Sequence, residues 1–126
     1  MAAGGEAVAS VENVTDEAGV ARMIQTALER FGRLDVVVNN AGINGPELFE
    51  NHTAEQFRRM CEVNYIGTVL VSHAAWRHFI NSGGGRIINT ASEGPLGIHE
   101  MMTAYGGPKG GVIGHTLALA AEALKY

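Results

Sequence analysis

The sequence predicts an α/β fold with about three parallel strands and flanking helices. Short apolar runs at residues 7–11, 34–38 and 87–88 alternate with longer segments in which apolar residues recur every three or four positions. The run at 34–38 is β-branched and almost uninterrupted, as in a strand that is covered on both faces of a parallel sheet. Strands that alternate with helices favour parallel pairing through helical crossovers.

The overall composition points to a single globular domain, which we place at residues 1–126. Hydrophobic residues make up 46% of the chain, and a net charge of −4 without a basic patch argues against nucleic-acid binding. No segment reaches the roughly 20 apolar residues of a membrane span. The single cysteine, Cys61, cannot form an internal disulfide, and we expect it to pack in the interior. We therefore expect a cytoplasmic protein that binds neither nucleic acid nor membranes.

The first strand is expected at residues 7–11, followed by a helix that begins near Thr15. Thr15 is a candidate N-cap, because acidic residues occupy the next two positions. An apolar stripe then runs to Phe31 and stops at Gly32, which is a natural C-cap. The second strand, at 34–38, follows directly.

The middle of the chain reads as a long helical region followed by a third strand. Thr53 and Gln56 form a capping-box pattern at its start, and helical periodicity resumes at residues 67–80. Three consecutive glycines at 83–85 end it, and a strand through 87–88 stops near Ser92.

The last helix is expected at residues 104–125, although it is rich in glycine. Gly106, Gly110 and Gly114 share one face, which lets another backbone approach closely. Pro108 is tolerable only in the first turn of a helix.

Polar residues follow two of the expected strands, and a tyrosine and a lysine come later, in the last expected helix. Asn39 and Asn40 follow the second strand, and Ser92 follows the third, so both occupy the sheet edge where ligands bind in open α/β folds. Tyr105 and Lys109 stand four residues apart and share a helix face. A phenol is a weak base at neutral pH, and a neighbouring cation favours its deprotonated form. This pairing indicates a general acid and base for hydride-transfer chemistry, with Ser92 bonding the substrate oxygen.

Each signal also has a plain structural interpretation when it is taken alone. Tyr105 and Lys109 fit an ordinary helix pair, and residues 39–42 fit a turn that ends a strand. Asn64 lies at a helix break, where it either caps the helix or holds a water that links Lys109 to solvent. The five histidines lack the spacing of paired metal ligands, so we assign no metal site.

Taken together, Asn39-Asn40-Ala41-Gly42, Asn64, Ser92 and Tyr105 with Lys109 resemble the short-chain dehydrogenase/reductase family in order and spacing. The resemblance implies a partial Rossmann-like three-layer fold and hydride transfer between NAD or NADP and a small-molecule carbonyl or secondary alcohol. It makes Asn64, Ser92, Tyr105 and Lys109 the catalytic residues. It further implies a homo-oligomer formed through the helices at 67–80 and 104–125. The implied cofactor contacts are Asn13, Val14, Asn40, Ala41, Gly42, Tyr105 and Lys109.

The chain departs from the family pattern at both ends, because no glycine-rich phosphate-binding turn precedes Ala7 and no strands follow the last helix. In the family sheet order the first two strands expected here are roughly 14 Å apart. The first strand must then pair anew beside the second, detach, or leave a gap for a partner chain, and each outcome weakens cofactor binding. The alternatives are a non-catalytic remnant, a helix-pair oligomerisation module, or an incomplete gene model.

Overall fold

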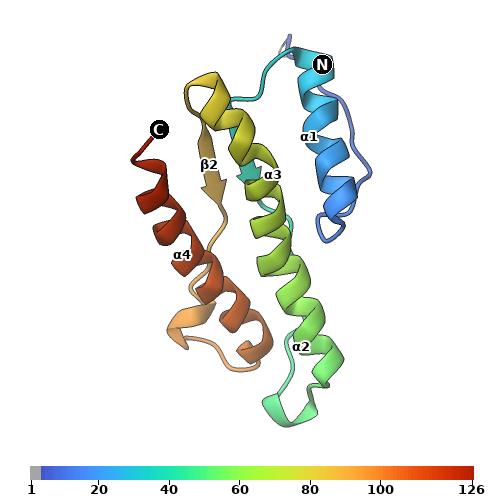
Figure 1. The fold of residues 1–126 in the computed structure, drawn as a ribbon. Coiled ribbons are helices and arrows are strands. Elements are labelled where there is room, and N and C mark those ends of the chain that lie inside the picture. Colours follow the sequence, from blue (N-terminus) through green and yellow to red (C-terminus); the bar gives the residue numbers. More distant parts are fainter. Residues whose placement is uncertain (1–3) are drawn as a thin grey trace.

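The computed structural model describes residues 4–126, and Figure 1 shows their arrangement. Helices dominate residues 4–126, and the two strands in this range are each four residues long. In chain order the elements are α1 (Glu17–Phe31), β1 (Val36–Asn39), the short 3-10 turn η1 (Phe49–Asn51), α2 (Ala54–Cys61), the π-helical turn η2 (Glu62–Ile66), α3 (Gly67–Ser82), β2 (Arg86–Asn89), the 3-10 turn η3 (Gly94–Leu96) and α4 (Thr103–Ala123).

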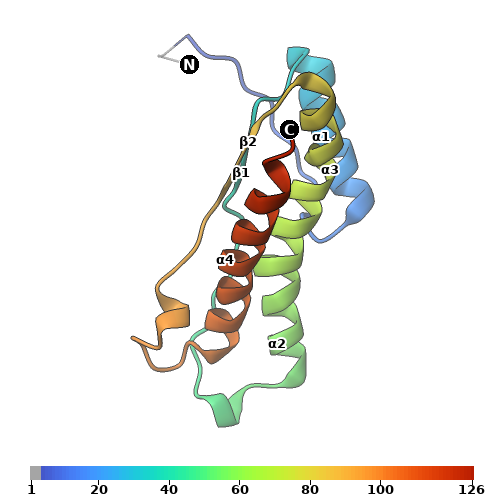
Figure 2. The same cartoon turned by 60° about the vertical axis from the view of Figure 1, so that its left-hand side comes forward.

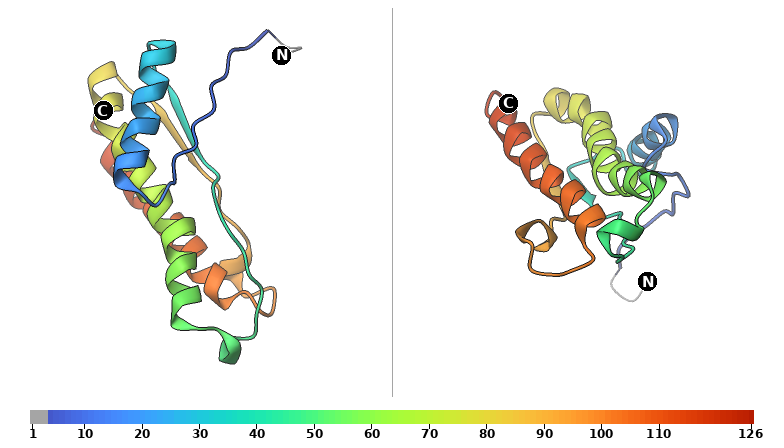
Figure 3. Two further views of the ribbon diagram at one scale, coloured as in Figure 1. Left: turned by 90° about the vertical axis from the view of Figure 1, so that its right-hand side faces the viewer. Right: turned by 90° about the horizontal axis from the view of Figure 1, so that it is seen from below.

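The sheet consists of β1 and β2, which pair in parallel with Asn39 opposite Asn89. The α/β class is confirmed, but the expectation of three strands and three layers is wrong for residues 4–126. All the helices lie on one face of the sheet (Figures 2 and 3). The other face leaves Val36, Val38 and Ile88 about half exposed.

The strand expected at residues 7–11 does not form. This segment pairs with neither β1 nor β2, and Val8 and Val11 are 46% and 99% exposed. A strand is stabilised by a hydrogen-bonded neighbour and by burial of one face, and this segment has neither. Of the three outcomes expected for it, detachment from the sheet is the one observed.

The helix ends follow local capping rules closely. The N-cap of α1 is Asp16, one residue after the predicted Thr15, because its carboxylate accepts hydrogen bonds from the amides at positions 18 and 19. Gly32 and Gly83 end α1 and α3 in the left-handed conformation, with φ of 73° and 85°. The capping box of Thr53 and Gln56 at α2 is confirmed.

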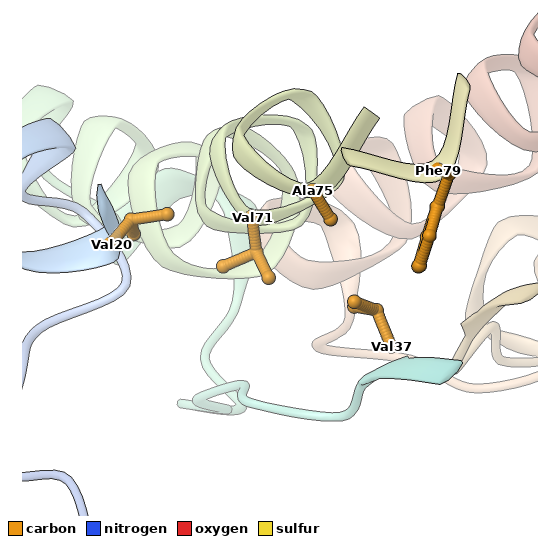
Figure 4. Close-up of a cluster of buried hydrophobic side chains, with 5 residues drawn as sticks. All are labelled: Val20, Val37, Val71, Ala75 and Phe79. Carbon is orange, nitrogen blue, oxygen red and sulfur yellow. The ribbon is translucent and has the colours of Figure 1, made fainter. Parts of the chain in front are cut away.

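The main core lies between α1, α3 and β1 (Figure 4). It is formed by five buried side chains: Val20, Val37, Val71, Ala75 and Phe79. Gly85 lies flat against the Phe79 ring, because a Cβ added to Gly85 would fall 2.3 Å from Cδ1 of that ring. Cys61, which was expected in the interior, is exposed at the last position of α2.

Helix α4 packs through its N-terminal half against α2, η2 and η3. Its glycines permit this contact: an added Cβ at Gly106 would lie 3.0 Å from the Gly94 carbonyl oxygen, and one at Gly110 would touch Pro95. Gly114 faces open space, so the close approach expected for it is not observed. Pro108 lies inside α4, beyond its first turn, and the helix continues past it.

The C-terminal half of α4 and helix α3 run along the same face of the sheet (Figures 1 and 3). A cavity of about 440 Å³ separates the two helices, and its walls include Trp76, Phe79, Leu119 and Tyr126. Within residues 4–126, none of these helices has the length and apolar character needed to cross a membrane.

Candidate active site

Lys109 lies at the centre of the candidate site, although its side chain is almost completely buried. Its residue is 4% exposed, and Nζ lies 5.8 Å from the centroid of the Tyr105 ring. Nζ donates a hydrogen bond of 2.6 Å to the main-chain carbonyl of Thr90, just beyond β2. The predicted helix pair therefore shares one face, with the amine tied to the sheet edge.

Burial lowers the pKa of Lys109, because removing water from around the ammonium disfavours its charged form. The Thr90 carbonyl partly replaces that water by accepting one of the three hydrogens of the ammonium. Two donors remain for other groups. One hydrogen of the Lys109 ammonium is thus bonded to the protein, and the other two are available to a ligand.

Ser92 and Tyr105 lie on either side of Gly94. The Gly94 amide donates to Ser92 Oγ over 3.1 Å. A Cβ added at Gly94 would lie 3.2 Å from Cδ1 of Tyr105 and 3.5 Å from Ser92 Oγ, so the two side chains border the same small volume. Because Ser92 Oγ accepts from this amide, its own hydrogen is free to point elsewhere. Sequence reasoning did not identify this role of Gly94.

Asn64 lies in the π-helical turn between α2 and α3 and is completely buried. Its Oδ1 accepts from the Ile43 amide, and its Nδ2 donates to the Ile43 carbonyl, each over 2.9 Å. Nδ2 also contacts Met60 Sδ at 3.5 Å. The side chain thus anchors the loop after β1, and an added Cβ at Gly42 would meet Asn64 Oδ1 at 2.8 Å. A water relay from Asn64 to Lys109 stays a prediction.

Thr90 joins the two strand ends and was not recognised from the sequence. Its amide donates to the Asn39 carbonyl over 3.0 Å, and its Oγ1 donates to Asn40 Oδ1 over 2.9 Å. Its own carbonyl accepts from Lys109. Asn40 is consequently placed at the same sheet edge as the lysine. The only sequence signal for Thr90 was its position directly after a strand.

Asn13 and Val14 lie next to the start of α3. Asn13 is exposed, and its Oδ1 accepts from the Thr15 amide over 3.1 Å. Val14 packs so closely on Gly67 that an added Cβ there would lie 2.8 Å from Val14 Cγ2. Among residues 4–126, no three His, Cys, Asp or Glu side chains gather where they would bind a metal ion.

Comparison with known proteins decides the family. The family model described as short chain dehydrogenase matches residues 1–126. The chain belongs to the short-chain dehydrogenase family. It is 38% identical, over 99% of its length, to the peroxisomal hydratase-dehydrogenase-epimerase of Neurospora crassa. The candidate site therefore consists of residues on a short-chain dehydrogenase framework.

Solved structures of the family have the same fold as this chain. A short chain dehydrogenase from Mycobacterium avium is 41% identical and superposes with a TM-score of 0.90 over 99% of the chain. The protein ElxO, solved with NADP bound, is 35% identical with a TM-score of 0.84 over 90% of the chain. The chain spans 46% of each of these two structures and 14% of the Neurospora protein.

Proposed function

We propose that this short-chain dehydrogenase chain contributes to an NAD(P)-dependent oxidoreductase that interconverts a small-molecule carbonyl and a secondary alcohol. One observation carries the proposal. A buried lysine lies beside Tyr105 at the carboxyl ends of β1 and β2, and Ser92 borders the same volume as that tyrosine. Packing alone does not explain a lysine at this position, because burying an ammonium costs free energy that an apolar side chain would not.

The proton-transfer roles follow from the hydrogen bonds. Ser92 Oγ accepts from the Gly94 amide, so its hydroxyl hydrogen is available to a substrate oxygen. The Tyr105 hydroxyl has no hydrogen-bond partner within residues 4–126 and is free to donate to the same oxygen. The Lys109 ammonium beside the ring stabilises the phenolate that remains after proton transfer.

The residues present fit a nicotinamide cofactor at this edge. When bound, that cofactor supplies or accepts the hydride. Lys109 keeps two hydrogen-bond donors beyond the Thr90 carbonyl, which suits the hydroxyls of a ribose. Asn40, Ala41 and Gly42 would border the cofactor from the loop that Asn64 anchors. Asn13 and Val14 would contact the adenine, since Asn13 Oδ1 retains a second lone pair.

Tyr105→Phe tests the proton donor. The variant should lower the rate of nicotinamide-dependent reduction of a carbonyl panel by about 10²-fold or more, because general acid catalysis is lost. Tyr126→Phe is the matched control, since Tyr126 is 62% exposed and lies beyond the end of α4, and it should retain the full rate. Turnover that survives Tyr105→Phe undiminished would exclude this tyrosine as the proton donor.

Cofactor binding is tested separately by titrating NADH and NADPH and following nicotinamide fluorescence. ElxO is solved with NADP, which makes NADPH the first choice to test. A saturable change below millimolar concentration supports binding by this chain. No saturable change with either nucleotide would exclude an autonomous enzyme composed of residues 1–126 alone.

The second candidate function is self-association through α3 and α4. The outer side of α4 exposes Ile113 and Leu117 at 39% and 69%, which favours an apolar interface. Sedimentation should show a dimer or larger assembly that Leu117→Lys dissociates, whereas Glu122→Lys, a control at an exposed charged position, should not. A strict monomer at high concentration would exclude this function.

A further inference from the structure

A continuous chain of side-chain hydrogen bonds crosses the strand ends from α3 to α4. Asn39 is at its centre, and its Nδ2 donates to Ser72 Oγ over 3.0 Å and to Asn89 Oδ1 over 2.9 Å. Ser72 Oγ continues to the Thr68 carbonyl in α3 over 2.7 Å. Asn89 Nδ2 continues in the other direction to Thr116 Oγ1 over 2.9 Å.

Thr116 completes the chain on α4. Its Oγ1 accepts from Asn89 and donates to the Val112 carbonyl over 2.7 Å. Each hydroxyl and amide therefore has a defined donor direction, and the network joins a main-chain carbonyl of α3 to one of α4. A connected network of this kind holds its members in one arrangement, because breaking any bond leaves a polar group without its partner.

The network is one of two polar attachments between α4 and the strand that ends beside the site. Within residues 4–126, the side-chain hydrogen bonds that join α4 to β2 and Thr90 are those of Lys109 and Thr116. The two residues are seven apart, so the attachments are spaced by about 10 Å along the helix. Two attachments at this spacing restrain the rotation and tilt of α4 more tightly than one does, and they add to the packing of its N-terminal half on α2, η2 and η3.

The surroundings of Thr116 make this second attachment important. The cavity between α3 and the C-terminal half of α4 includes Thr116 and Asn89 in its walls, so this half of the helix packs only loosely on the sheet beside Thr116. The next apolar contact lies beyond the end of α4, where the rings of Trp76 and Tyr126 meet edge to face at 6.1 Å. Thr116 is itself exposed. Threonine has only modest helix propensity, so propensity does not account for Thr116. Its side-chain contact with another element is the hydrogen bond from Asn89.

We propose that Thr116, acting through Asn89, is a positioning residue that holds Lys109 in its buried place below Tyr105. This inference rests on the proposed function only in one respect, which is that the proposed chemistry uses Lys109. Thr116 touches neither the tyrosine nor the reacting atoms. Its contribution is to keep α4 in the register that lets Nζ reach the Thr90 carbonyl.

The test measures Lys109 directly, without cofactor or substrate. The chain has two lysines, so limited acetylation followed by peptide mass spectrometry gives separate rates for Lys109 and for the exposed Lys125. The rates are recorded from pH 7 to 11. In the wild-type chain the Lys109 midpoint should lie below 10.5, because burial lowers its pKa.

Thr116→Val and Thr116→Ala should both release Lys109 toward water. The expected result is an upward shift of the Lys109 labelling midpoint by about 0.5 pH unit or more and a limiting rate about threefold higher, since desolvation is reduced. The rate at Lys125 should not change. Thr116→Ser retains the hydroxyl and should restore the wild-type profile.

Thr26→Val is the matched control, because Thr26 makes the same hydrogen bond to the carbonyl four residues earlier in α1, at 2.8 Å. Circular dichroism establishes that each variant is folded. If Thr116→Val does not fold, Thr116→Ala decides the test, because alanine has the higher helix propensity.

A wild-type Lys109 profile in both Thr116 variants would overturn the proposal. An equal shift in Thr26→Val would also overturn it, because general loosening would then be the cause. These outcomes are independent of turnover. Failure of the oxidoreductase assay would leave the labelling result intact, and a negative labelling result would leave the oxidoreductase proposal standing.

Discussion

Replacing Asn64 with alanine should destabilise this protein strongly, because a completely buried side chain joins two parts of the chain there. The change removes two hydrogen bonds to Ile43 and leaves the Ile43 amide and carbonyl without partners in a partly buried place, which costs about 1–3 kcal/mol for each group. Truncation to alanine also leaves a small cavity, so the free energy of unfolding is expected to fall by roughly 3–5 kcal/mol.

Urea unfolding followed by far-UV circular dichroism measures this loss. The total stability of a domain this size is about 5–15 kcal/mol, so the midpoint should fall clearly. Asn51→Ala is the matched control. Asn51 is exposed and donates to Glu47 over 3.1 Å, so its replacement should change stability by no more than about 0.5 kcal/mol. A loss below about 1 kcal/mol for Asn64→Ala would show that the loop does not depend on this anchor.

Three further outcomes follow from the structure. Burial lowers the pKa of Lys109 in the folded state, so between that lowered pKa and 10.5 the unfolded chain binds more protons than the folded one. The free energy of unfolding should therefore rise with pH across this range, and urea titrations of Lys109→Met should lack the rise. An equal rise in Lys109→Met would contradict the prediction. Gly106→Ala should cost about 1–3 kcal/mol because its Cβ meets the Gly94 carbonyl, whereas Gly107→Ala in open space should stabilise by up to about 1 kcal/mol; equal thermal shifts would refute the packing argument. Asp16→Ala should lower the thermal midpoint by the equivalent of about 1 kcal/mol, and Asp16→Asn should lower it less because it keeps one cap acceptor.

Helix ends were predictable from the sequence because capping depends on residues within one turn. Gly32 and Gly83 ended helices where expected, and Thr53 with Gln56 began one. The strand expected at 7–11 failed for the opposite reason. An apolar run has the same pattern whether or not a neighbouring strand is available, and that neighbour is set by residues far away in the chain.

The candidate site was predictable only where a side chain carries the function. The spacing of Tyr105 and Lys109 placed them on one helix face, and Ser92 was expected after a strand. Thr90 was missed, and so was the contact of Gly94 with Ser92 and Tyr105. Thr90 acts on Lys109 through a main-chain carbonyl, and Gly94 acts by lacking a Cβ, so neither leaves a recognisable residue pattern.

The residues proposed for proton transfer and those proposed for cofactor binding lie in different regions of the chain. Thr90 bonds Lys109, and the Gly94 amide bonds Ser92 next to Tyr105, so these contacts arise where α4 packs against η3 and the residues that follow β2. Asn13, by contrast, follows the unpaired and exposed segment 4–11. If Lys109 is desolvated and nucleotide binding is weak, low activity would therefore come from weak cofactor binding and not from misplaced proton-transfer residues. Measuring both quantities on the same chain separates an effect on the proton-transfer residues from an effect on cofactor binding.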